Sequence, residues 1–161
     1  MVRKTGRVKN LVTEILLTLS VFGCTYSQNM VNPEGHVITC SSWGWGCIGG
    51  PMAINIFDKC IANYQQLGYL EIEKVGIPGF YLSEENPPTV LRVQPGYPAE
   101  KVGIMADDSI IAVNGQKVNS RNDAYILGFC KAGDVVSYEI LRKEEHKSFS
   151  LVTVPKLSKP Q

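Results

Sequence analysis

The spacing of apolar residues predicts one amphipathic helix in the first half of the chain. In residues 51–68, PMAINIFDKCIANYQQLG, apolar side chains recur at i, i+3, i+4 and i+7, as one face of a helix requires. The residues of this face are Ala53, Ile56, Phe57, Cys60, Tyr64 and Leu67. Pro51 stands where a first helical residue belongs, and Gly68 stands where the chain leaves a helix. Upstream, YSQNMV and the alternating run HVITC flank the turn residues NPEG and predict a small hairpin.

A glycine-rich tract, SSWGWGCIGG, separates the predicted hairpin from the predicted helix. We expect it to form a packed loop whose two tryptophan rings cover the helix. A ligand site is the alternative reading of the same residues.

From Leu70 onward, apolar and polar residues alternate in short runs, which is typical of strands. The runs are YLEIEKV, GFYLS, PTVLRVQ, DDSIIAVNG with QKV, DVVSYEILRK and KSFSLVTVPK, the last two joined by the hairpin KEEH. PAEKVGI predicts a short helix that ends at Gly103, and SRNDAYILGFCKAG predicts a second one with Ser120 as N-cap that ends near Gly133. Short strands with two helices predict an α+β fold, a small partly open β-barrel or sandwich of about six strands.

The N-terminus has the pattern of a secretory signal. Four basic residues within the first ten precede LVTEILLTLSVFGC, which is too short to cross a bilayer. The ending SVFGC resembles the signal of bacterial lipoproteins, which implies lipidation of Cys24 and removal of residues 1–23. The alternative is an uncleaved amphipathic N-terminus, which Glu14 would suit. In such lipoproteins an aspartate after the lipidated cysteine often marks retention in the inner membrane, but here Thr25 follows Cys24. We therefore expect anchoring in the bacterial cell envelope at the outer rather than the inner membrane, facing the periplasm.

Charge and motifs exclude several classes of function. The 161 residues carry a formal net charge of +1, and the chain without residues 1–23 has 12 Lys and Arg against 14 Asp and Glu. This balance gives no reason to expect nucleic acid as a partner. The chain contains neither G-x-S-x-G nor H-E-x-x-H, and its two histidines, His36 and His146, complete no catalytic set. We therefore predict that the protein is not an enzyme and that it uses no cofactor.

The five cysteines allow a disulfide. With Cys24 assigned to lipid, four cysteines remain, and an oxidising periplasm would let two of them pair. Cys60, on the apolar face of the helix, and Cys40, at the end of the hairpin, are the preferred pair, with Cys47 as the competing partner. A zinc site of His36 with Cys40, Cys47 and Cys60 lacks the C-x2-C spacing of zinc knuckles, so no metal is predicted.

The second half of the chain resembles a known domain. VLRVQPGYPAEKVGIMADDSIIAVNGQKV and the later KAGDVVSYEILRKEEHKSFSLVTV are similar to the PDZ domain in the form that accompanies bacterial periplasmic proteases. The resemblance covers about residues 76–155. The whole chain also resembles small bacterial lipoproteins that have one PDZ domain and no protease domain. The resemblance of the whole chain implies a signal peptide at 1–23, a hairpin-and-helix segment at 24–69, a PDZ domain at 70–156 and a tail at 157–161.

The resemblance implies that the domain binds a protein or peptide, either a C-terminus or an internal segment, by strand addition. The ligand would lie between a strand and a helix, and its carboxylate would meet backbone N–H groups of a loop. Carried over to this sequence, the loop and strand are Ile77, Gly79, Phe80, Tyr81 and Leu82, and the helix residues are Ala124, Leu127 and Gly128. We expect Leu127 to belong to the core more than to the groove.

Two residues depart from the PDZ pattern. Pro78 has no N–H, so one donor that the carboxylate usually meets is missing. Asp107 stands where relatives usually have glycine. A structural PDZ subunit of an envelope or secretion complex, with its groove filled, is the alternative to a peptide-binding module. Backbone geometry at residues 77–80 would distinguish the two.

Overall fold

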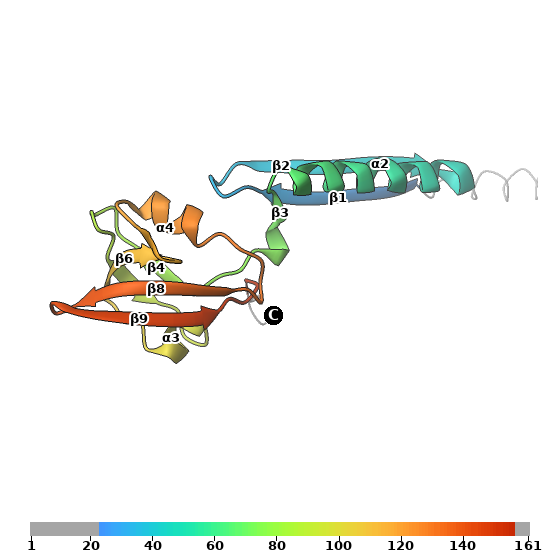
Figure 1. The fold of residues 1–161 in the computed structure, drawn as a ribbon. Coiled ribbons are helices and arrows are strands. Elements are labelled where there is room, and N and C mark those ends of the chain that lie inside the picture. Colours follow the sequence, from blue (N-terminus) through green and yellow to red (C-terminus); the bar gives the residue numbers. More distant parts are fainter. Residues whose placement is uncertain (1–22, 157–161) are drawn as a thin grey trace, which may run out of the picture. The chain divides into compact units, whose positions relative to one another are not determined.

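The computed structural model describes residues 23–156 (Figure 1). The predicted signal peptide, apart from Gly23, and the predicted tail at 157–161 lie outside the described residues. The described chain divides into two compact units. Residues 23–29 and 38–67 form the first unit, and residues 30–37 join residues 68–156 in the second. None of the described helices is long and apolar enough to cross a membrane.

The first unit is a two-stranded hairpin with one helix. Strand β1 (Gly23–Val31) neighbours β2 (Val37–Trp45), and helix α2 (Gly46–Gln66) follows directly. A disulfide joins Cys40 of β2 to Cys60 of α2, with the two Cα atoms 5.9 Å apart. The preferred pairing is therefore the one formed, and it uses two of the three cysteine sulfurs that the zinc alternative would need.

The helix differs from its prediction in its start and in its buried face. It begins at Gly46, so Pro51 lies inside it and removes one intrahelical N–H instead of starting the helix. Ala53 is buried, but Ile56 is 58% exposed and Leu67, the C-cap residue, is 70% exposed. A single helix on two strands can bury only a narrow stripe, which leaves part of a wide apolar face in contact with solvent.

The tryptophan tract divides between the end of β2 and the start of α2 and does not form a loop. Residues 41–45 continue β2, and the exposed rings of Trp43 and Trp45 stack edge to face on each other with their centroids 6.3 Å apart. Between them, a Cβ on Gly44 would lie 2.1 Å from the carbonyl oxygen of Gly49. Gly44 and Gly49 therefore allow the backbones of strand and helix to approach closely, where a packed loop was expected.

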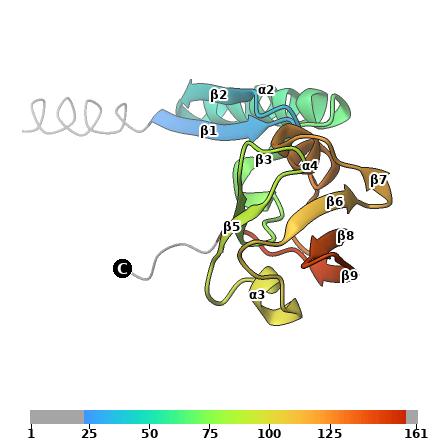
Figure 2. The same cartoon turned by 90° about the vertical axis from the view of Figure 1, so that its left-hand side faces the viewer.

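The second unit has two sheets and two α-helices among its described residues. One sheet pairs β4 (Phe80–Leu82) with β5 (Val90–Val93). The other has the order β7-β6-β8-β9 and contains β6 (Ser109–Val113), β7 (Gln116–Lys117), β8 (Val135–Arg142) and β9 (Glu145–Val152). Helix α3 (Pro98–Val102) and helix α4 (Arg121–Leu127) lie on opposite sides of these strands (Figures 1 and 2). The expected α+β fold of PDZ type is confirmed.

Three predicted boundaries in the second unit were wrong. YLEIEKV is not one strand: β3 (Leu70–Glu71) pairs with the end of β1, and a 3-10 helix, η1 (Ile72–Lys74), follows. Helix α4 ends at Leu127 and not near Gly133, because Gly128 caps it. The charged hairpin is also tighter than KEEH, since only Lys143 and Glu144 form its turn. Both have positive φ, 50° and 70°, as a two-residue hairpin turn requires.

The core of the second unit lies between the sheets and the helices. It contains aliphatic residues from both sheets, with Phe80 and Tyr138 as its aromatic members. The buried carboxylate of Asp108, 1% exposed, bonds to the guanidinium of Arg142 at the edge of this core. At Asp107, φ is +69°, so aspartate holds the left-handed conformation that glycine adopts more easily.

Candidate functional site

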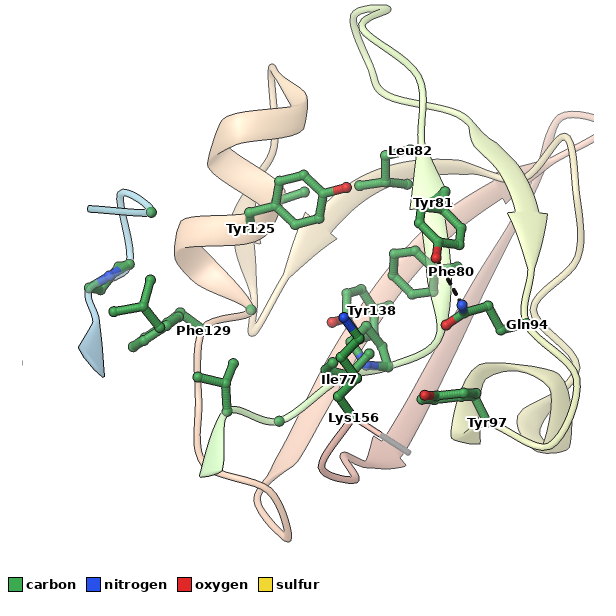
Figure 3. Close-up of a pocket in the computed structure, with 18 of the residues that line it drawn as sticks. Ile77, Phe80, Tyr81, Leu82, Gln94, Tyr97, Tyr125, Phe129, Tyr138 and Lys156 are labelled. Carbon is green, nitrogen blue, oxygen red and sulfur yellow. Dashed lines mark hydrogen bonds between the residues drawn. The ribbon is translucent and has the colours of Figure 1, made fainter. Parts of the chain in front are cut away.

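A cavity of about 430 Å³ opens beside β4 in the second unit (Figure 3). Strand β4 and the loop before it form one wall, and α4 forms another. The residues from the loop and strand are Val75, Gly76, Ile77, Pro78, Phe80, Tyr81 and Leu82. Ala124, Tyr125, Gly128 and Phe129 come from α4 and the residues after it. The hairpin turn at 31–35, which belongs to this unit, completes the lining together with Gln94, Tyr97, Tyr138 and Lys156.

The free edge of β4 faces this cavity. In the described residues, β4 pairs with β5 alone. The Gln94 N–H donates to the Gly79 oxygen at 2.7 Å, so the Gly79 carbonyl points toward the strand that contains Gln94. Phe80 and Val93, the next pair in register, are then a non-hydrogen-bonded pair. The N–H and C=O of Phe80 therefore point away from β5 and toward the edge where another strand could add.

The loop before β4 has few free donors. The Gly76 N–H donates to the Cys130 oxygen and the Ile77 N–H donates to the Val154 oxygen, both at 2.8 Å. Pro78 has no N–H. Within the described part of the chain, the Gly79 N–H makes no hydrogen bond, and that of Phe80 faces the cavity. Two adjacent backbone donors are thus available for an anion at this loop.

Gly79 is required by two features of the loop. Its φ is +94°, which side-chain-bearing residues rarely adopt. A Cβ at this position would also lie 2.0 Å from the Cβ of Tyr97. The loop can therefore pass over Tyr97 and enter β4 only with glycine at position 79.

Helix α4 is placed by its N-terminal cap. The Ser120 hydroxyl accepts from the Asp123 N–H at 3.1 Å, and the Asp123 carboxylate accepts from the Asn119 N–H at 3.0 Å. The helix then presents Ala124 and Tyr125 to the cavity, and Figure 3 shows the Tyr125 ring directed toward Leu82.

Two residues near the end of α4 have different roles. Leu127 is absent from the cavity lining and packs against the core, as expected. Gly128 lines the cavity, where a Cβ would lie 3.1 Å from the Tyr138 hydroxyl. The end of α4 therefore approaches Tyr138 closely.

Aromatic rings form the floor of the cavity. Phe80 meets Tyr138 edge to face, with centroids 5.2 Å apart and an interplanar angle of 82°. Burial raises the pKa of the Tyr138 hydroxyl above its ordinary value, so the phenol stays neutral at physiological pH. The floor is therefore apolar and uncharged.

Tyr81 points to the outer face of β4. Its hydroxyl accepts from the Gln94 amide at 2.8 Å, and the Arg92 guanidinium carbon lies 4.2 Å from its ring centroid. These contacts hold the ring at the outer rim of the cavity, where Tyr81 is 39% exposed.

The structure brings most of the expected residues together. Ile77, Phe80, Tyr81, Leu82, Ala124 and Gly128 line the cavity, and Gly79 shapes the loop beside it. Sequence reasoning missed Tyr125, Phe129, Tyr138, Gln94 and Lys156. Tyr125 could have been found as the exposed neighbour of Ala124 on the same helix. Lys156 gave no signal, since it lies after the last strand.

An open strand edge beside a short helix, within an α+β unit, is the arrangement of the PDZ class. Residues 79–153 match the family model of the PDZ domain. The second unit therefore contains a PDZ domain over this segment.

Similar proteins are larger. Protease Do-like 1, chloroplastic, from Arabidopsis thaliana is 33% identical over 97 residues, which are 53% of this chain and 20% of the relative. A probable periplasmic serine endoprotease DegP-like from Marinomonas sp. (strain MWYL1) is 31% identical over 83 residues, 51% of this chain and 18% of the relative. This chain thus spans about a fifth of the length of these curated relatives.

The solved structure of the HtrA-type protease AlgW with a decapeptide shares the fold. Its TM-score is 0.50 at 14% identity, and the match covers 69% of this chain and 36% of that one.

Proposed function

We propose that this protein is a lipid-anchored interaction module whose PDZ domain binds a peptide C-terminus or extended segment by adding it as a strand to β4. The main support is the edge of β4 that no described strand pairs with, where the Phe80 N–H and C=O are directed toward a cavity walled by α4. A strand added there would gain main-chain hydrogen bonds, and the cavity would select its side chains. The decapeptide present with the similar protease AlgW supports a peptide as ligand.

The proposed location is outside the cytoplasm. A periplasmic and a chloroplastic protease are among the similar proteins, and the Cys40–Cys60 disulfide suits an oxidising compartment. Anchoring would occur through lipid on Cys24, which is exposed at the start of β1, with the outer membrane preferred. Under this proposal the protein is not itself a protease. It would hold a peptide or protein partner at the membrane.

A structural PDZ subunit remains the competing proposal. The hairpin turn at 31–35 lines part of the cavity, as a chain segment that fills its own groove would. A cavity of about 430 Å³ nevertheless stays open beside β4, and this space favours binding.

The first test fills the cavity from α4. Ala124 is buried and lines the cavity, so Ala124→Leu places three further carbons where the ligand would lie. We expect it to weaken binding of labelled hexapeptides with apolar last residues by about tenfold or more, measured by fluorescence polarisation on the full chain.

Asn122→Leu is the matched control for this variant. It adds the same side chain to the exposed side of the same helix, outside the cavity, and should leave binding unchanged. Thermal melts of both variants separate loss of binding from loss of fold. Equal affinities for the folded Ala124→Leu variant and its control would contradict the groove assignment.

A further inference from the structure

Among the described residues that line the cavity, Lys156 is the only one with a charged side chain. The other lining residues are apolar, aromatic or neutral polar. Figure 3 shows Lys156 beside Ile77, with its side chain directed into the cavity. It is exposed, and none of the ion pairs within the described residues includes it. Its ammonium group is thus available to a ligand.

Backbone pairing holds Lys156 near the loop. The Ile77 N–H donates to the Val154 oxygen at 2.8 Å, and the Val154 N–H donates back to the Ile77 oxygen at 3.3 Å. This isolated bridge ties the chain after β9 to the loop that precedes β4. Lys156 follows the bridge by two residues, so the fold itself brings its side chain to the loop.

The loop lacks a donor at the place where Lys156 approaches it. Pro78 has no N–H, and the Ile77 N–H is used in the bridge to Val154. A carboxylate that accepts from Gly79 and Phe80 would keep lone pairs without partners. A lysine ammonium has three donors and a compensating charge, and its long stem can reach such a carboxylate.

We propose that Lys156 binds the terminal carboxylate of the peptide and replaces the donor that Pro78 lacks. This inference rests on the proposed function and makes it more specific, because it assigns the site to peptides with a free C-terminus in preference to internal segments. The apolar surroundings, with Phe80 and Tyr138 on the floor, would take an apolar side chain from the last residue. Lys156 would therefore act as a specificity-determining residue.

The test compares two forms of one hexapeptide on two forms of the full chain. The peptide ends in phenylalanine or valine, as a free acid or as the amide, and the protein is unchanged or carries Lys156→Met. We expect the unchanged protein to prefer the free acid by about tenfold. Lys156→Met should weaken binding of the free acid by about three- to tenfold and leave the amide unchanged, the range expected for a half-exposed charge pair.

Two further variants control the measurement. Lys156→Arg keeps the charge and should retain most of the affinity for the free acid. Lys101→Met removes an exposed charge on α3, outside the cavity, and should change neither affinity. Raising the salt concentration should weaken binding of the free acid to the unchanged protein more than binding of the same peptide to the Lys156→Met variant.

The possible results separate the inference from the proposed function. If both peptide forms bind the unchanged protein equally, or if Lys156→Met weakens both forms equally, Lys156 does not bind the carboxylate while strand addition stands. If no form of the hexapeptide binds the unchanged protein, the proposed function fails and this inference fails with it.

Discussion

Replacing Arg142 with methionine is expected to lower the free energy of unfolding by about 3–5 kcal/mol, the usual cost of leaving a buried charge without its partner. Asp108 is only 1% exposed, and both of its carboxylate oxygens accept from the Arg142 guanidinium, at 2.6 and 2.7 Å. The same guanidinium donates to the Gly103 oxygen at 2.7 Å. Methionine retains most of the apolar stem of arginine but none of these three bonds.

Arg142 stays positively charged at the pH of a measurement of unfolding. The hydrogen bond to Asp108, aided by its negative charge and opposed by burial, raises the pKa of the Arg142 guanidinium above its ordinary value. A group whose pKa is higher in the folded state contributes stability below its unfolded pKa and loses it only as the pH rises through the folded one. Urea unfolding at pH 7 therefore measures the full contribution.

Two variants make this prediction specific. Arg92→Met removes an exposed arginine over the Tyr81 ring and should cost no more than about 1 kcal/mol. The double variant Asp108→Asn with Arg142→Met removes both charges, yet its amide oxygen can still accept from the Met105 N–H, now 2.8 Å from Asp108. The double variant should recover about half of the free energy of unfolding that Arg142→Met loses. An Arg142→Met variant as stable as Arg92→Met would show that the buried pair contributes nothing.

Gly79→Ala is expected to lower the free energy of unfolding by about 3–5 kcal/mol and to abolish peptide binding. Two separate costs add at this position. Alanine at a φ of +94° is strained by about 1–2 kcal/mol, and its Cβ would collide with the Cβ of Tyr97 at 2.0 Å. Relief requires the loop to move, which displaces the N–H groups of Gly79 and Phe80.

Gly133→Ala is the matched control for this substitution. Gly133 has a φ of +98°, but a Cβ there would meet nothing within 4 Å. It should show the strain alone, about 1–2 kcal/mol, and leave peptide binding intact. Chemical unfolding of both variants gives the comparison. Equal losses at the two positions would mean that the contact with Tyr97 does not constrain the loop.

The β4 side of the site could be predicted because its determinants are local. Gly79 and Pro78 mark the loop by their own backbone restrictions, and the strand follows at once. The resemblance to PDZ domains then gave this strand its role. On α4, the cap at Ser120 set the start of the helix, but sequence spacing alone could not separate Ala124 and Tyr125, which face the cavity, from Leu127, which faces the core.

The other features could not be predicted because they depend on pairings between distant residues. Lys156 reaches the loop only through the bridge between Ile77 and Val154. Asp108 and Arg142 are 34 residues apart and meet because β6 and β8 are neighbours in the sheet. The spacing of apolar and polar residues along the sequence does not indicate contacts between residues so far apart.

In the first unit, apolar spacing overestimated what the helix buries. Ile56 fits the apolar face but lacks a surface to cover it. The prediction of a loop for the tryptophan tract was wrong for a different reason. Its glycines allow strand and helix backbones to approach, and the sequence shows glycine without showing what lies against it.

A scan of backbone N-methylation along a bound hexapeptide would show whether the peptide adds as a strand to β4. Methylation removes one peptide N–H at a time, and only alternate N–H groups of an added strand face β4. If the peptide binds as a strand, we expect methylation at alternate positions to weaken binding by about tenfold or more, and methylation at the positions between them to change it less than about threefold. Equal sensitivity at every position, or insensitivity at all of them, would show that the peptide does not bind as a strand on β4.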